Sequence, residues 1–316
     1  MRMIQSKLMN VSLREVDTDT TARSPNWLRR TFGWRTWAER PLAHSSAVGQ
    51  SGTVQVAPDL LRRADRADTL PRLGGMARPN GVVIVSERHW AFARVDGELF
   101  EGEMPERRQR AARIPLVRGL LRLAASMTPL VRGQGVAGRR ERSLLLLAVG
   151  APLLFWLLPA TVGLVAGIVV SVGLVAWVMR GRTLRLHGAE HRAIAAAEQR
   201  QLAAAWAGTA RPSRFSPRCG TNFAALALPV TYLLDTVWPF SPAPWAPAVV
   251  AVLSLALTME LWQVVQDPAG RILRPLLVPG LALQRVTTRE PALADTRVAL
   301  AAVESVLRRD LDRVDP

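Results

Sequence analysis

Residues 144–179, LLLLAVGAPLLFWLLPATVGLVAGIVVSVGLVAWVM, run for 36 positions without a charged side chain. A single straight helix of that length would extend about 54 Å, whereas about 20 apolar residues cross a bilayer once. Pro159 divides the stretch into two parts that together are short for two complete crossings. We therefore expect a membrane hairpin that is thin, tilted or partly re-entrant.

Arginines flank this hairpin and a second apolar pair, 223–238 and 245–266, which is joined by the connector PFSPAPWAP. Neither the connector nor the apolar segments contain Lys or Arg. Basic residues stand before and after each pair: Arg139, Arg140, Arg142, Arg180, Arg182, Arg185, Arg214, Arg218, Arg271 and Arg274. By the positive-inside rule, this pattern predicts four membrane segments in two hairpins with both termini in the cytoplasm.

The charge balance agrees with a lipid bilayer as the partner. The chain has 41 Lys+Arg against 25 Asp+Glu, a net charge of +16, yet Lys7 is its one lysine and many arginines flank the apolar segments. No nucleic-acid-binding motif accompanies them, so nucleic acid is not expected as a partner. The single cysteine, Cys219, excludes a disulfide framework within the chain, and the first 30 residues lack the apolar core of a cleavable signal peptide.

The remaining segments complete a mainly α, polytopic membrane protein. Residues 1–70 are polar and aperiodic, and we expect a disordered extension there. The membrane domain should span 71–311. Its expected parts are a small β-hairpin element at 81–104 turning at Asp96-Gly97, an amphipathic interfacial helix at 111–133, the hairpins 144–179 and 223–266, and an amphipathic cytoplasmic helix at 296–314.

A short motif with metal-binding chemistry follows the first hairpin, His187-Gly188-Ala189-Glu190-His191. Residues i and i+4 share one face of a helix, so the two imidazoles can hold one divalent ion. The order H-x-x-E-H also occurs in inverted zinc peptidases, where the glutamate is the general base. The alternative is a polar helix start with two solvated histidines.

A zinc enzyme commonly has a third protein ligand, and three residues qualify on the cytoplasmic side: Cys219, Glu260 and Glu290. Cys219 could equally pack as a buried thiol, or act as a nucleophile if Arg218 lowered its pKa. Glu260 lies inside an apolar segment, where an acid is costly, and is either functional or paired with an arginine such as Arg271.

Three blocks in order, HGAEH at 187–191, PRCGT at 217–221 and PGLALQRVTTREP at 279–291, resemble the YqhQ-like family of bacterial membrane proteins. The resemblance extends over about 74–311 and includes GGMARPNGVVIV at 74–85. Members of this family, whose function is not established, are described as metal-dependent enzymes of unknown reaction. The resemblance implies a place in the bacterial inner membrane and a site built from His187, Glu190, His191, Cys219 and Glu290.

Two departures from the family pattern bear on that site. Ser216 stands where family members commonly have histidine, and Asn80 where they commonly have an acidic residue. A metal site that used those side chains would be weakened. Two functions follow as hypotheses: zinc-assisted hydrolysis with Glu190 as base, or a non-catalytic membrane module for assembly or regulation. A transporter is less well supported, since Asp235 and Glu260 are the acids within the apolar segments.

Overall fold

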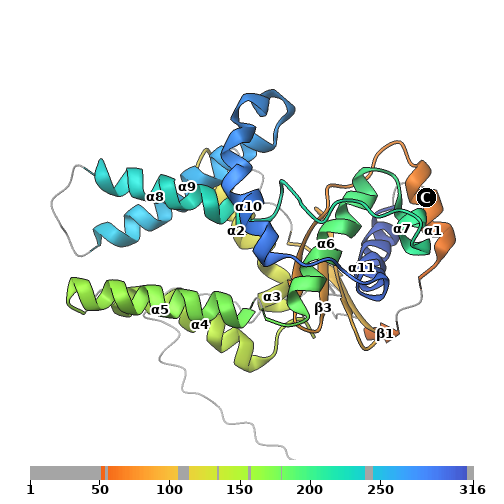
Figure 1. Ribbon diagram of the computed structural model, residues 1–316, viewed down its shortest axis with the longest axis horizontal. Coiled ribbons are helices and arrows are strands. Elements are labelled where there is room, and N and C mark those ends of the chain that lie inside the picture. Colours follow the sequence, from red (N-terminus) through yellow and green to blue (C-terminus); the bar gives the residue numbers. More distant parts are fainter. Residues whose placement is uncertain are drawn as a thin grey trace, which may run out of the picture. The chain divides into compact units, whose positions relative to one another are not determined.

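The computed structural model of the chain describes residues 51–53, 56–105, 114–133, 135–155, 158–178, 180–238 and 245–311. Helices dominate these residues, and one small antiparallel sheet accompanies them (Figure 1). The prediction of a mainly helical chain with a small β element is therefore confirmed.

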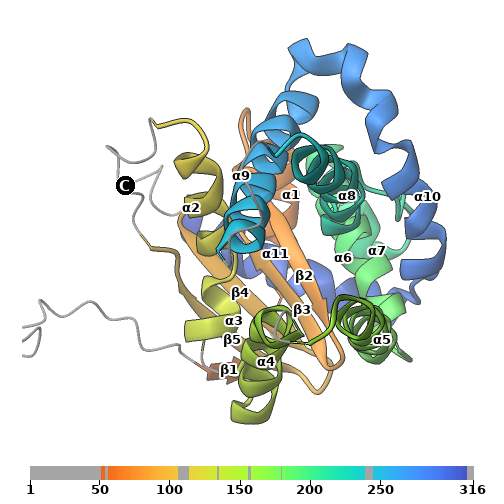
Figure 2. The same ribbon diagram turned by 90° about the vertical axis from the view of Figure 1, so that its left-hand side faces the viewer.

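The sheet has five strands in the order β1-β5-β4-β3-β2 (Figure 2). These are β1 (Ser51–Thr53), β2 (Gly74–Arg78), β3 (Gly81–Val85), β4 (His89–Arg94) and β5 (Glu98–Glu103). The turn from β4 to β5 contains Asp96-Gly97, as expected, and Gly97 has a φ of +92°. The sheet is larger than the expected element at 81–104, because β1 and β2 add a strand at each edge.

Side chains alternate between the two faces of the sheet, as a period of two requires. Val82 and Ile84 of β3 belong to a core shared with helices α6 (Thr183–Glu198) and α11 (Leu293–Leu311). Val83 points the other way, into a second core with Trp90 and Phe92. The first core positions the helix that carries the histidine motif.

The N-terminal extension needs a correction, because order begins well before residue 70. Pro58–Arg66 form helix α1, and its Leu61 and Ala64 are fully buried in the first core. The carboxylate of Asp65 also accepts the backbone N–H groups of Leu202 and Ala203, at the start of α7 (Leu202–Ala207). Three arginines and two aspartates surround the two buried positions, so the sequence of this helix does not look like a core segment. Residues 1–50 lie outside the described part.

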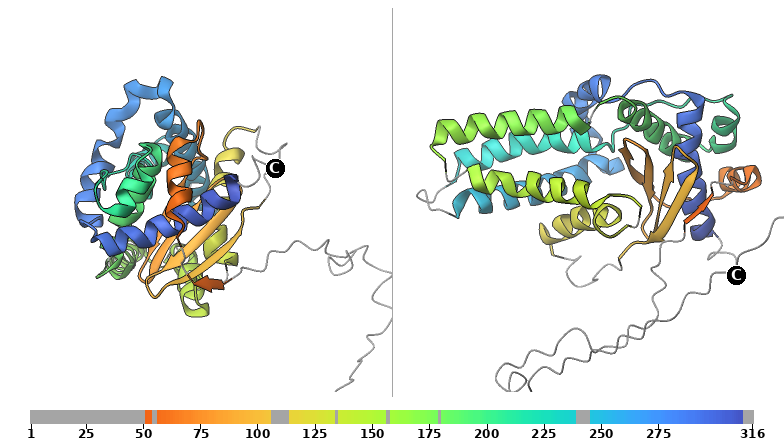
Figure 3. Two further views of the ribbon diagram at one scale, coloured as in Figure 1. Left: turned by 90° about the vertical axis from the view of Figure 1, so that its right-hand side faces the viewer. Right: turned by 90° about the horizontal axis from the view of Figure 1, so that it is seen from below.

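The C-terminal helix also differs from the expected amphipathic helix at 296–314. Helix α11 starts at Leu293 and is described to Leu311, and residues 299–307 are all buried. It packs against β3, β4 and α6. Alanines between the larger apolar residues allow close approach from several directions, so α11 is a core helix (Figure 3).

The expected interfacial helix at 111–133 is two helices, α2 (Val117–Ser126) and α3 (Thr128–Arg132), and residues 106–113 lie outside the described part. The break falls at Met127, just before Pro129. Helix α2 packs against α9 (Ala246–Gln266), whereas Leu130 of α3 enters the second core.

Four helices form the two apolar hairpins, α4 (Arg139–Phe155) with α5 (Ala160–Val178) and α8 (Gly220–Thr236) with α9 (Ala246–Gln266). Among the described residues, α9 is the one helix long and apolar enough to cross a membrane, and α5 contains a shorter apolar stretch. Large apolar side chains are exposed along these helices, among them Leu146, Leu147, Val165, Val169, Val172, Leu228 and Leu233. One candidate span indicates membrane association, while the number of crossings stays a prediction.

The hairpins are fastened to the rest of the chain at their bases. Arg78 of β2 donates to Glu141 of α4 at 2.5 Å, and Gln266 at the end of α9 donates to the carbonyl of Pro217, just before α8. Between α5 and α6 the chain turns at Gly181, whose φ is +60°. After α9, the 3₁₀ segment η3 (Pro268–Leu277) leads into α10 (Val278–Thr287).

Candidate metal centre

Helix α6 brings the two motif histidines together on one face, as their spacing predicts. The ring centroids of His187 and His191 lie 4.5 Å apart, and both side chains are buried. Gly188 lies against the carbonyl of Arg289, where any side chain would collide. Because the loop after α10 crosses α6 at this glycine, the histidines are covered rather than solvated.

Cys219 joins the histidines from the N-terminus of α8. Its Sγ lies 3.3 Å from Nε2 of His187, and one ligand atom from each of the three residues lies within 4.8 Å of the others. In the part of the chain that the structure describes, no other group of three His, Cys, Asp or Glu residues is arranged so that it could hold a metal ion. A buried His-His-Cys group of this kind could bind a metal ion.

The backbone fixes which ring nitrogens are free to bind. Nδ1 of His187 donates to the carbonyl of Thr287 at 2.8 Å, and Nδ1 of His191 donates to the carbonyl of Arg214 at 2.6 Å. A carbonyl can only accept, so in the neutral rings Nδ1 carries the hydrogen and Nε2 carries a lone pair. Nε2 of His191 is buried without a hydrogen-bond partner. This is how proteins orient histidine ligands around zinc.

Burial sets the charge state of these groups. It lowers the pKa of His187 and lowers that of His191 to about 4, so both imidazoles are neutral and able to ligate at neutral pH. Burial also raises the pKa of the Cys219 thiol to about 11. The alternative of a nucleophile activated by Arg218 is not supported, because the thiol pKa is raised and the guanidinium pairs with Glu198. A thiol with this pKa is a poor nucleophile, although a bound cation would favour its thiolate.

Glu190 lies on the same helix but contacts the sheet edge. Its carboxyl group accepts a hydrogen bond from the backbone N–H of Ala77 in β2, and burial raises its pKa to about 8. Gly75 makes room for it, since a Cβ there would lie 2.9 Å from Cγ of Glu190. Glu190 is outside the group of three ligand atoms.

The other two acidic candidates are engaged elsewhere. Glu260 accepts from the guanidinium of Arg118 and from the backbone N–H of Leu116, so its partner is not Arg271. Glu290 is 63% exposed and pairs with Arg192 at 2.6 Å and with Arg214 at 3.6 Å. The structure therefore gives both glutamates ion-pair roles and leaves them out of the group of three.

The two departures from the family pattern lie outside the group of three as well. The hydroxyl of Ser216 accepts from the backbone N–H of Arg218, and Asn80 lies in the turn between β2 and β3, where its carbonyl accepts from Val95. The group of His187, His191 and Cys219 therefore forms in this chain although positions 216 and 80 are serine and asparagine.

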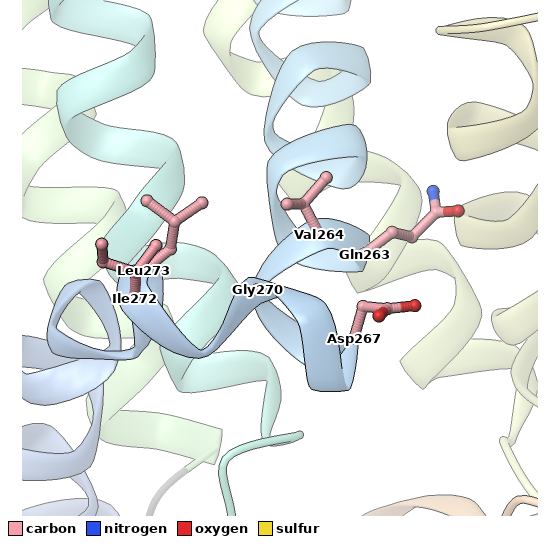
Figure 4. Close-up of a pocket in the computed structure, with 6 residues that line it drawn as sticks. All are labelled: Gln263, Val264, Asp267, Gly270, Ile272 and Leu273. Atoms are coloured by element: carbon pink, nitrogen blue, oxygen red, sulfur yellow. The ribbon is translucent and has the colours of Figure 1, made fainter.

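A cavity in the described part of the chain lies away from this group. It has a volume of about 460 Å³ and opens at the junction of α9 and η3 (Figure 4), lined by Gln263, Val264, Asp267, Gly270, Ile272 and Leu273. His187, His191 and Cys219 do not line this cavity.

The fold and the site define a mainly helical protein with a small antiparallel sheet and a buried His-His-Cys group. Residues 151–309, half of the chain, match the family "Protein of unknown function (DUF1385)", and the chain belongs to that family. It is 31% identical over 134 residues to the uncharacterized protein YqhQ of Bacillus subtilis (strain 168). That alignment covers 40% of this chain and 41% of YqhQ, so the chain spans about two-fifths of its relative's length. The expected YqhQ-like resemblance is confirmed, and no solved structure matches the chain.

Proposed function

We propose that the chain is a polytopic protein of the bacterial inner membrane that holds a divalent metal ion, zinc, at the cytoplasmic membrane face. The ligands are His187, His191 and Cys219. The observation that carries the proposal is the buried Nε2 of His191, which has no partner although its Nδ1 is held by a carbonyl. An orphaned buried nitrogen costs free energy, and a metal ion would relieve that cost.

The reaction we propose is metal-assisted hydrolysis. Catalytic zinc sites have three protein ligands, and an ion held by His187, His191 and Cys219 would supply a water molecule of lowered pKa. Glu190 is the residue of α6 suited to accept the proton. Its pKa of about 8 would fall beside a cation, which favours the carboxylate that a base requires.

The membrane topology we propose rests on the exposed apolar side chains of the two hairpins and on their basic flanks. Arg139 precedes the first hairpin and Arg182 follows it, and the base of the second is held by the contact from Gln266 to Pro217. In this topology the ends of both hairpins that join the rest of the chain lie on the cytoplasmic side. The metal ligands of α6 and Cys219 then lie at the cytoplasmic surface of the membrane.

Metal content tests the metal site. Elemental mass spectrometry of the detergent-purified chain should find close to one metal ion per chain, and the double variant His187→Ala, His191→Ala should lose it, because two of three ligands are gone. Glu290→Gln is the matched control and should retain the metal, since its carboxylate faces arginines. Absence of metal in the unmodified chain after reconstitution with zinc would refute the site.

A reporter fusion tests the topology. A reporter that is active only in the periplasm, fused near Ser241, should be active, because that connector joins the second hairpin on the outer side. A fusion at the end of α6, near Gln199, should be silent. An inactive reporter at Ser241 would overturn the four-segment arrangement.

A second candidate function is a non-catalytic membrane module for assembly or regulation. The hydrogen bond from Ala77 to Glu190 favours it, because this contact gives the glutamate a structural task at the free edge of β2. In that case, the His-His-Cys group would hold α6, α8 and the loop after α10 together without turnover.

A further inference from the structure

We infer that Gln284 of α10 is the positioning residue of the metal loop, residues 214–219, and so sets where Cys219 meets the imidazoles. The inference rests on the metal site proposed above. It assigns to α10 a role that neither the H-x-x-E-H spacing nor the cysteine indicates.

Gln284 holds the metal loop by both ends of its amide. Its Oε1 accepts from the backbone N–H of Ser216 at 2.8 Å, and its Nε2 donates to the carbonyl of the same residue at 2.7 Å. The side chain is 0% exposed. Asn222 of α8 donates to the same carbonyl at 2.9 Å. Two buried amides therefore hold the backbone N–H and C=O of Ser216, which belong to two successive peptide groups, where water cannot replace them easily.

Ser216, the residue they hold, lies between two parts of the metal centre. Ser216 stands two residues after Arg214, whose carbonyl holds Nδ1 of His191, and three residues before Cys219. The guanidinium of Arg214 also donates to the carbonyl of Thr288 at 2.9 Å. A shift of this loop would move a ligand and the group that orients another ligand at the same time.

Residues on one face of α10 contact the metal loop, α8 and His187. Gly280, Gln284 and Thr287 follow the i, i+4, i+7 spacing of a single helix face. Gly280 packs directly on Asn222, leaving no room for a side chain, and the carbonyl of Thr287 holds His187. On the other side, Val286 is 74% exposed. The helix thus joins the metal loop, α8 and His187 into one scaffold.

The test uses the full chain in detergent and the variant Gln284→Met, which nearly keeps the side-chain volume but removes both hydrogen bonds. Gln263→Met is the matched control, because Gln263 contacts Arg122 and Met259 rather than the metal loop. Cys219 is the one cysteine of the chain, so alkylation by a maleimide reports on the metal loop alone. In the metal-free protein, Gln284→Met should raise the alkylation rate about tenfold or more, as expected for lost buried hydrogen bonds.

Cobalt titration supplies the second readout. The unmodified chain should bind Co²⁺ with a thiolate-to-cobalt absorption band, and Gln284→Met should bind it about 10- to 100-fold more weakly with an altered band, the usual effect of losing an outer partner of a metal site. Asn222→Ala, which removes one of the three hydrogen bonds, should have an intermediate effect and serves if Gln284→Met fails to fold.

The outcomes separate the two proposals. Equal alkylation rates and equal cobalt binding in Gln284→Met and the unmodified chain would overturn the positioning role. No cobalt band in the unmodified chain would refute the metal centre. In that case, faster alkylation of Gln284→Met would still support the role of Gln284 in holding the metal loop. An unchanged rate would refute that role as well.

Discussion

Replacing Glu190 with glutamine is expected to lower the hydrolytic rate by about 10²- to 10⁴-fold, the usual contribution of a general base, and to leave the metal content unchanged. Glutamine has nearly the same shape, and its Oε1 can still accept the N–H of Ala77 beside Gly75. The substitution therefore removes the proton acceptor and keeps the contact with the sheet edge. Loss of cellular function at normal expression, alongside normal metal content, is the measurable result.

The same substitution decides between the two candidate functions. A structural role for Glu190 predicts full function with glutamine, because the hydrogen bond to β2 survives. Glu290→Gln is the control for the chemical change, since it removes a charge from an exposed ion pair outside the group of three. Full function of Glu190→Gln would remove the glutamate as a base and favour the non-catalytic module.

Placing aspartate at Ala302 is expected to lower the free energy of unfolding by about 3–5 kcal/mol, the cost of an uncompensated buried charge. Ala302 is fully buried in the first core, on the helix that packs against β3 and β4. All residues from 299 to 307 are buried, so a carboxylate at 302 would stand in the core. Thermal unfolding of the purified chain measures the effect, as a large fall in the melting temperature.

The matched substitution is Ala294→Asp, in the exposed first turn of the same helix. An acidic residue there lies near the positive end of the helix dipole, so stability should change by less than about 1 kcal/mol. Similar melting temperatures for the two variants would mean that α11 lies on the surface, as the sequence pattern suggested, and would contradict its place in the core.

The sequence predicts those features that local spacing determines. The block at 144–179 predicts the hairpin of α4 and α5, and Asp96-Gly97 predicts the turn between two strands. The i, i+4 spacing predicts that His187 and His191 share a face. In each case the physical cause acts within a few residues or along one continuous apolar run.

Features that depend on distant partners could not be predicted in this way. The orienting carbonyls of Arg214 and Thr287 belong to the backbone, which every residue has, so no residue type marks them. The sequence of β2, GGMAR, does not indicate a strand, because what makes it one is its pairing with β3. Glu260 is an acid in an apolar helix, and only the approach of α2 shows that Arg118 neutralises it.

The left-handed turn at Gly181 has a consequence for how relatives of this chain can vary. An α-helix rotates by about 100° per residue, so in one continuous helix an insertion in the apolar part would swing the imidazoles away from Cys219. Gly181 has a left-handed φ of +60°, so α5 and α6 are separate helices and a change of helical phase in α5 does not carry over into α6. The lengths of α4 and α5 can therefore differ between relatives while the angular positions of His187 and His191 around α6 stay the same.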